Sequence, residues 1–243
     1  MKEFSLLKYL QKTKQVTRRE FEDMVFEKAL RINYQPVEDI KARIRLWDFL
    51  EVDLWEDWVY QETVKSFPNY KPLIVSFNKP KGYVVSKSDK YNKTIFELLP
   101  KSWQRDFYYI WRLDKYSRGL LLLTNDPELV DYYENPKNRV FKIYEVVVDK
   151  PFKSNHILKT KKWMYVNRDW KVDSKGELLY FYDINKTAGK LRIVLKEWKN
   201  QHIRRVLTAL GYKIKDLKRI KVGKYELWDI KEWKYMINKI KRK

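Results

Sequence analysis

The residues best able to do chemistry lie in one short segment, Trp111-Arg112-Leu113-Asp114-Lys115-Tyr116-Ser117-Arg118-Gly119. Asp114 ends an apolar-alternating stretch and has three cations close to it in sequence: Arg112, Lys115 and Arg118. Gly119 permits a positive φ, so the chain can turn there into a buried apolar strand. A carboxylate in this position is a candidate nucleophile. The plainer interpretation is a solvated loop aspartate, which an isolated Asp would favour.

Two later segments carry further polar residues on predicted elements. Residues 139–148 are typical of a strand, in which Lys142 and Tyr144 share one face because side chains alternate. From this spacing alone, a core aromatic and a functional tyrosine are about equally supported at position 144. Residues 191–198 predict another strand, and the helix after it places Arg204 beside the apolar stripe formed by Ile203, Val206, Leu207 and Leu210.

Turn and cap signals separate these elements. Residues 73–77 predict a buried strand, and the Lys79-Pro80-Lys81-Gly82 segment must turn because Pro80 fixes φ and Gly82 permits a positive one. Asp126 and Pro127 are typical of a helix start, and Pro136 ends that helix. Taken alone, the lysine, proline and glycine form a turn and nothing more.

In this order, the motifs resemble those of the pseudouridine synthases, in particular the bacterial ribosomal RNA branch typified by the small-subunit uridine isomerase. The matching motifs are Arg-Leu-Asp ending at Asp114, Lys-Pro-x-Gly beginning at Lys79, Lys-x-Tyr ending at Tyr144, and the arginine pair at Arg204. The resemblance covers most of residues 5–230. It implies that Asp114 is the essential catalytic residue, that Arg204 pairs with it, and that Tyr144 packs against the target base.

The reaction implied is the isomerisation of a specific uridine in ribosomal RNA to pseudouridine after the nucleotide leaves its stack. No metal, nucleotide or redox cofactor is expected. Beyond the three catalytic residues, we expect RNA contacts from nine cations: Arg18, Arg19, Lys79, Arg112, Lys115, Arg118, Lys142, Lys199 and Arg205. The partner implied is ribosomal RNA or a pre-ribosomal particle, bound by a monomer.

The composition independently favours a polyanionic partner. Lys and Arg number 53 against 32 Asp and Glu, a formal charge of +21, which concentrates polyanions near the protein. Charge alone leaves RNA, DNA and acidic membranes open, but no run of about 18 apolar residues predicts a membrane span. The absence of cysteine excludes disulfides and thiol catalysis, and His156 and His202 lie too far apart in sequence to suggest a metal site. We therefore expect a cytoplasmic protein.

The predicted fold class is α+β. Residues 1–53 predict two helices, the second starting at a Thr17/Glu20 capping box, followed by short strands. That order resembles the S4 RNA-binding domain. Taken alone, a solvated basic face on a small domain explains the charge equally well, but beside the downstream motifs RNA docking is favoured. Residues 54–70 are expected to be a linker. Residues 71–243 are expected to form the catalytic domain, with a largely antiparallel, mixed sheet flanked by helices.

Two other functions stay open at this point. A non-catalytic RNA-binding protein of ribosome assembly could keep the same scaffold, and it would explain the charge and the first unit. A DNA-binding protein would explain the charge but not the motifs. Neither explains why Asp114, Tyr144 and Arg204 occur together.

Overall fold

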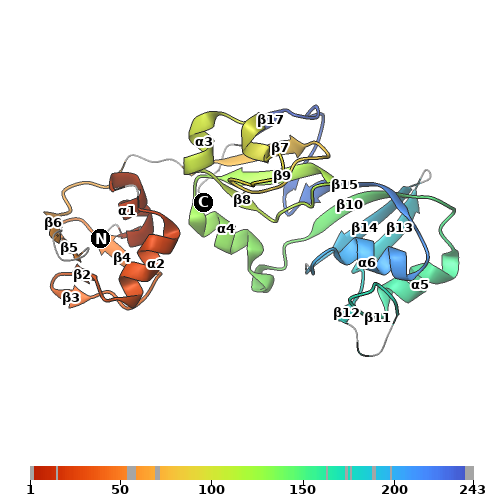
Figure 1. The fold of residues 1–243 in the computed structure, drawn as a ribbon, viewed down its shortest axis with the longest axis horizontal. Helices are drawn as coiled ribbons and strands as arrows, with labels where there is room; N and C mark the ends of the chain where they lie inside the picture. The colour runs from red at the N-terminus through yellow and green to blue at the C-terminus, as the bar shows by residue number, and fades with distance from the viewer. Residues whose placement is uncertain are drawn as a thin grey trace. The chain divides into compact units, whose positions relative to one another are not determined.

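The computed structural model describes residues 3–14, 16–53, 59–68, 72–162, 164–172, 175, 177–187, 190–197 and 199–238, without the side chains of Val59 and Thr187. The chain separates into two compact units, Met1–Lys71 and Pro72–Lys243 (Figure 1). Each unit is described by itself. None of the helices in the described ranges has the length and apolar composition that a membrane crossing requires.

The first unit packs two helices against short antiparallel strands. Helix α1 (Leu6–Thr13) begins at Ser5, whose side chain accepts from the Lys8 amide, and α2 (Arg18–Phe26) begins at the reciprocal Thr17/Glu20 capping box. Strand β1 pairs with β4, and the other four strands form a sheet in the order β3-β2-β5-β6. The strands are β1 (Glu3–Ser5), β2 (Leu30–Ile32), β3 (Gln35–Pro36), β4 (Arg43–Arg45), β5 (Phe49–Asp53) and β6 (Val59–Thr63).

The first unit continues past residue 53, which corrects the expected linker at 54–70. Strand β6 lies inside that range and pairs with β5 over its whole length. Glu62, on this strand, accepts a hydrogen bond from the Tyr9 hydroxyl at 2.8 Å, which ties the strand to α1. Positions 54–58 and 69–70 of the expected linker lie outside the described residues.

The second unit is built on a nine-stranded sheet in the order β13-β14-β10-β15-β9-β7-β17, with β16 paired to β15 and β8 paired to β9. Every pairing in it is antiparallel except β15 with β9, which confirms the expected α+β class and mixed, largely antiparallel sheet. The strands are β7 (Ile74–Lys79), β8 (Tyr108–Ile110), β9 (Arg118–Thr124), β10 (Lys142–Val148), β13 (Asp183–Thr187), β14 (Lys190–Leu195), β15 (Ile214–Val222), β16 (Tyr225–Glu226) and β17 (Tyr235–Asn238).

Helices and one small hairpin cover this sheet. In Figure 1, α5 and α6 lie beside β13 and β14, and the hairpin of β11 (Met164–Val166) and β12 (Glu177–Leu179) lies next to α6. The α6 stripe is buried as its spacing predicts, with Ile203, Val206 and Leu207 in the core. The helices are α3 (Lys101–Asp106), α4 (Pro127–Glu134), α5 (Ser154–Lys161) and α6 (His202–Ala209), with short 3-10 turns η1 (Ile95–Leu98) and η2 (Pro136–Asn138).

The parallel contact between β9 and β15 joins the two halves of the sheet, and Gly119 makes it possible. Gly119 pairs with Arg219 and has φ +101, a value that L side chains rarely adopt. A Cβ at this position would lie 2.9 Å from the Arg219 backbone nitrogen and closer still to its carbonyl oxygen. No flexible side chain can yield there, so β9 and β15 would have to separate.

We therefore expect Gly119→Ala to destabilise the second unit by about 3 kcal/mol or more, combining backbone strain with overpacking. Urea denaturation followed by circular dichroism measures this. A matched control is Gly82→Ala, since Gly82 also has a positive φ (+90) but has nothing within 4 Å of an added Cβ. Equal losses in the two variants would contradict the steric account, because both carry the φ penalty and one alone carries the clash.

Candidate active site

Asp114 lies in the loop between β8 and β9, whose start is fixed at Trp111. The expected strand running up to Asp114 stops earlier, at Ile110, because Trp111 takes φ 54 and turns the chain. The Trp111 amide donates to Glu134 Oε1 at 2.6 Å, and its indole Nε1 donates to the Tyr133 carbonyl at 2.7 Å. Both partners lie on α4, so this helix holds the entrance of the loop.

Lys79 holds the far side of the same loop. Its ammonium donates to the carbonyls of Ser117 (2.8 Å), Asp114 (3.3 Å) and Lys115 (3.4 Å), and to that of Pro80 (2.9 Å). The side chain is fully buried, and this burial lowers the pKa of Lys79 to about 8, against the opposing effect of Asp114. Lys79 therefore positions the Asp114 backbone. It is not exposed to a phosphate, which corrects its expected role as an RNA contact.

Arg204 approaches the Asp114 carboxylate from α6. Its Nε lies 3.7 Å from Asp114 Oδ2, and its Nη2 donates to the Ser117 hydroxyl at 3.2 Å. The arginine thus contacts both ends of the turn that carries the acid, since the Ser117 amide also donates to the Asp114 carbonyl at 3.0 Å. The side chains are 34% exposed for Asp114 and 20% for Arg204, so the pair is accessible from solvent.

Tyr144 lies on β10 and is fully buried. Burial raises the pKa of its hydroxyl, the charge and hydrogen bond of Arg219 oppose that effect, and the Asp114 charge reinforces it. Arg219 is itself fully buried and donates to the carbonyls of Leu120 (2.7 Å) and Trp111 (2.6 Å). Tyr144 therefore belongs to the layer beneath the Asp114 loop.

Lys142 shares the buried face of β10 with Tyr144, as the alternation predicts, but it is not available to RNA. Its ammonium lies 3.6 Å from the centre of the Trp111 indole ring and donates to the Lys196 carbonyl at 3.3 Å. The expected phosphate contact of Lys142 is thus corrected: the residue supports the loop that starts at Trp111. Burial, followed by the charge of Arg219, lowers the pKa of Lys142 to about 7.

This buried amine predicts a pH-dependent stability. The folded protein releases the Lys142 proton near pH 7, whereas the unfolded chain keeps it until about pH 10.5, so stability rises with pH across that window. We expect the free energy of unfolding of the wild type to increase relative to Lys142→Met between about pH 6 and about pH 9. Urea denaturation of both proteins at each pH measures the difference. A difference that stays constant with pH would contradict the assignment.

The other cations expected to contact RNA differ in their exposure and in their bonding partners. Arg112 is exposed, and the Lys115 ammonium donates to Asn92 Oδ1 at 2.7 Å. Arg118 forms a bidentate pair with Asp216. Arg205 is buried, so its expected RNA contact is corrected too: it pairs with Glu177 and donates to the Val166 carbonyl. The remaining members of the set are Lys199, which lies 3.5 Å from Glu177, and the first-unit residues Arg18 and Arg19.

Asp114 and Arg204 open into a cavity of about 710 Å³. Its described lining also contains two cations of the loop, Arg112 and Lys115, and residues from two other segments: Trp170, Asn200 and Gln201. Asp114 is the one acidic group among these lining residues. The cavity therefore combines several cations with one carboxylate among its described lining residues, a combination that suits a ligand with anionic groups. No group of three or more His, Asp or Glu in the described ranges is arranged to hold a metal ion.

Sequence reasoning missed several members of the site. Arg219 donates to the Trp111 carbonyl at the start of the Asp114 loop, but its sequence neighbours give no sign of this contact. Trp170 follows a turn at Asn167, and no periodic pattern connects it with Asp114. The signal that was available is the polar pair Asn200-Gln201 directly before α6, since residues at a helix start commonly line a site.

Comparisons with known proteins show the family of the chain. A family model described as RNA pseudouridylate synthase matches residues 73–209. "Ribosomal small subunit pseudouridine synthase A" of Vibrio vulnificus is 26% identical over 70% of this chain and 70% of its own length. "Ribosomal large subunit pseudouridine synthase B" of Bacillus subtilis is 26% identical over 84% of this chain and 79% of its own. A solved pseudouridylate synthase, 21% identical, covers 97% of this chain and 96% of its own with a TM-score of 0.64, which shows a shared fold.

Proposed function

Since the chain belongs to the RNA pseudouridylate synthase family, and is thus an RNA pseudouridine synthase, we propose that it converts a specific uridine of ribosomal RNA with Asp114 as the essential catalyst. One observation carries the assignment: the Asp114 carboxylate lies 3.7 Å from Arg204, in a cavity that contains no other acid among its described lining residues. The proposed enzyme acts as a monomer in the cytoplasm.

The chemistry explains why a carboxylate is needed. The bond between N1 of uracil and C1′ of the ribose breaks, the base rotates, and C5 bonds to C1′; C5 then loses its proton and N1 gains one. Positive charge develops at C1′ when the first bond breaks, and a carboxylate there stabilises that charge or bonds to the carbon. C1′ is not reachable in a stacked helix, so the nucleotide must be flipped into the cavity.

Arg204 has a positioning role in this proposal. Its contacts to Asp114 and to Ser117 hold the carboxylate at one place, beside a fixed positive charge. The exposed Arg112 and the nearby Lys115 are placed to contact the phosphates that flank the flipped nucleotide. The target base then occupies the Asp114 cavity, in which Asn200 and Gln201 form part of the wall.

Tyr144 is the proposed floor of the uracil site. It lies below the Asp114 loop in the described structure, close enough for the Asp114 charge to influence its hydroxyl. In the proposal its ring contacts the base when the cavity deepens on RNA binding, a change within the range seen when flexible loops meet a ligand. The buried Arg219 charge also acts on this hydroxyl, on the same side of the loop.

Ribosomal RNA is the proposed substrate because the names of two relatives state ribosomal subunits as their targets. The charge of +21 suits a large polyanion. A test uses the purified chain and ribosomal RNA transcripts that carry tritium at C5 of uridine. Forming the C5–C1′ bond releases the tritium, so release from small- or large-subunit transcripts supports the proposal. Release from transfer RNA transcripts alone would reject the substrate, and tight RNA binding without any release would favour a non-catalytic protein.

The first unit is proposed as an S4-like RNA-binding domain that docks the substrate. Arg18 and Arg19 open α2, and Arg19 is exposed. Two phosphate contacts contribute about 1.4 to 1.8 to the slope of log affinity against log salt.

We expect the Arg18→Gln, Arg19→Gln double variant to bind RNA more weakly and to show a slope that is smaller by about that amount. Fluorescence anisotropy across a salt series measures both quantities. A control is Lys224→Gln, which removes an exposed charge from the second unit. A double variant with an unchanged slope would show that α2 does not contact phosphates.

A further inference from the structure

A second cavity, of about 770 Å³, adjoins the cavity of Asp114. Trp170, Asn200 and Gln201 line both cavities. Neither Asp114 nor Arg204 is among the described residues that line the second one. Both volumes fall in the range of about 300–1,000 Å³ typical of small-ligand sites. The two cavities are therefore neighbouring compartments with a common wall, and only the first is lined by Asp114.

The common wall is fixed in shape by Asn167. Its side-chain oxygen accepts from the backbone amides of Asp169 at 3.0 Å and Lys171 at 2.9 Å. The backbone amide of Asn167 in turn donates to the Lys171 carbonyl at 2.9 Å. The Trp170 amide donates to the Asn167 carbonyl at 3.1 Å, so the tryptophan belongs to this closed turn. A half-buried indole on a rigid turn is a preformed surface for stacking.

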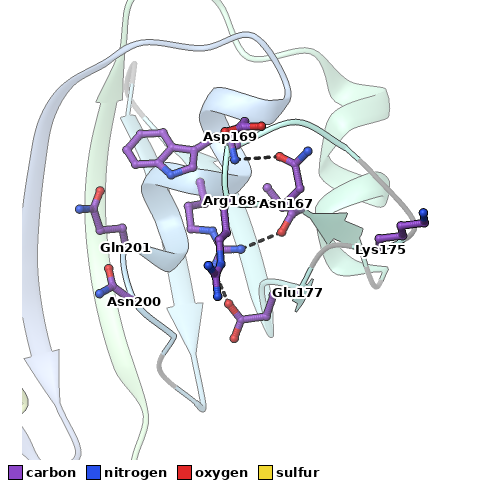
Figure 2. Close-up of a pocket in the computed structure, with 10 residues that line it drawn as sticks. Asn167, Arg168, Asp169, Lys175, Glu177, Asn200 and Gln201 are labelled. Carbon is purple, nitrogen blue, oxygen red and sulfur yellow. Dashed lines mark hydrogen bonds and ion pairs between the residues drawn. The ribbon is translucent and has the colours of Figure 1, made fainter.

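The second cavity has polar walls that carry charges of both signs: Arg168, Lys175 and Arg205 are cationic, and Asp169 and Glu177 are acidic. Figure 2 shows Asn200 and Gln201 on one side, facing Arg168 and Glu177, with Lys175 set apart on its own loop. Amide groups can pair with the edge of a base, and cations can contact its phosphate. The Glu177 carboxylate does not oppose an anionic ligand, because Arg205 and Lys199 both pair with it.

We propose that this second cavity binds the nucleotide adjacent to the target uridine on the same RNA strand, with the base of that neighbour stacked on Trp170. The inference rests on the proposed function and extends it by assigning a subsite for sequence context. A flipped uridine pulls its neighbour out of register, so a stacking surface at the common wall keeps the strand extended across both cavities. Because the two cavities share these wall residues, two consecutive nucleotides of one RNA backbone can occupy them side by side.

The test is steady-state kinetics on the ribosomal RNA fragment that releases tritium. Three full-length variants are compared with the wild type: Trp170→Ala, Trp170→Phe and Trp228→Ala. Trp228 is a matched control because it is also a tryptophan with positive φ (42, against 63 for Trp170), is 73% exposed, and lines neither cavity. Thermal unfolding confirms that each variant is folded.

We expect Trp170→Ala to lower kcat/KM about 10-fold, mainly through KM, since stacking on an aromatic ring stabilises the ground state as well as the transition state. Trp170→Phe should keep most of the activity, and Trp228→Ala all of it. Fragments that lack the base on the 5′ or the 3′ side of the target complete a cycle. One of them should lower the wild-type kcat/KM by the same factor and lower that of Trp170→Ala no further.

Three results would overturn the subsite. In the first, Trp170→Ala has the kcat/KM of the wild type. In the second, the loss of kcat/KM in Trp170→Ala multiplies with the loss caused by each base-lacking fragment, which would mean that Trp170 and the neighbouring base do not interact. A fall in kcat alone, with KM unchanged, would indicate that Trp170 shapes the Asp114 cavity and not a neighbouring one. Failure of the proposed function would give a different result, because the wild type would then release no tritium from any fragment.

Discussion

The Asp114→Asn variant is expected to lose isomerisation by about four orders of magnitude or more, while it binds RNA nearly as the wild type does. The substitution removes the charge that acts at C1′ and changes the side-chain volume little. The backbone contacts of residue 114 to Lys79 and Ser117 do not involve the carboxylate, so the loop keeps its shape. Single-turnover tritium release measures the rate, and fluorescence anisotropy measures the affinity.

Asp229→Asn is the matched control, because Asp229 is an exposed carboxylate of the same unit and does not line the Asp114 cavity. It should leave the rate unchanged. Full turnover by Asp114→Asn would remove Asp114 from the mechanism. A loss of rate together with an equal loss of RNA binding would instead show that the acid organises the binding surface.

Arg204→Ala is expected to slow the single-turnover rate about 10²- to 10³-fold, with a smaller change in RNA affinity. The substitution leaves the Asp114 carboxylate without its cation at 3.7 Å and also removes the contact to Ser117. The rate of Arg204→Lys should fall between those of the wild type and Arg204→Ala, since lysine keeps the charge but cannot make both contacts at once. This graded order distinguishes positioning of the acid from a general loss of stability.

The control for Arg204 is Arg192→Ala, which removes an exposed arginine from β14 in the same unit. Thermal unfolding shows whether each variant is folded. An Arg204→Ala protein that is folded and fully active would reject the pairing role, and one that loses RNA affinity as strongly as rate would make Arg204 an RNA contact.

Local signals predicted the elements whose ends depend on nearby residues. The capping box at Thr17 and the Asp126-Pro127 start of α4 are present as expected, because these caps involve groups within three positions of each other. The alternation that puts Lys142 and Tyr144 on one face is also confirmed. The membership of β6 in the first unit was missed, since its acidic Glu62 suggests an exposed connector, whereas its pairing with β5 and its bond to Tyr9 form only in the folded chain.

The roles of the cations were harder to predict, because the sequence does not show whether a charged side chain is buried or exposed. Lysine is rarely buried, so Lys79 and Lys142 were expected to contact phosphates. Lys79 is stabilised inside the protein by carbonyls from two segments, and Lys142 by the Trp111 ring and a carbonyl of residue 196. These partners come together only in the folded chain, and no local pattern records them.

Mapping pseudouridine in the RNA of the host shows whether Asp114 makes pseudouridine in ribosomal RNA. Carbodiimide-dependent stops of reverse transcription are mapped on total RNA from the native host, with the gene, without it, and with the Asp114→Asn form restored. We expect a stop in ribosomal RNA that disappears on deletion and returns with the wild-type gene but not with Asp114→Asn. A stop that Asp114→Asn also restores would contradict the assignment of the catalyst, and an unchanged ribosomal RNA map would contradict the substrate.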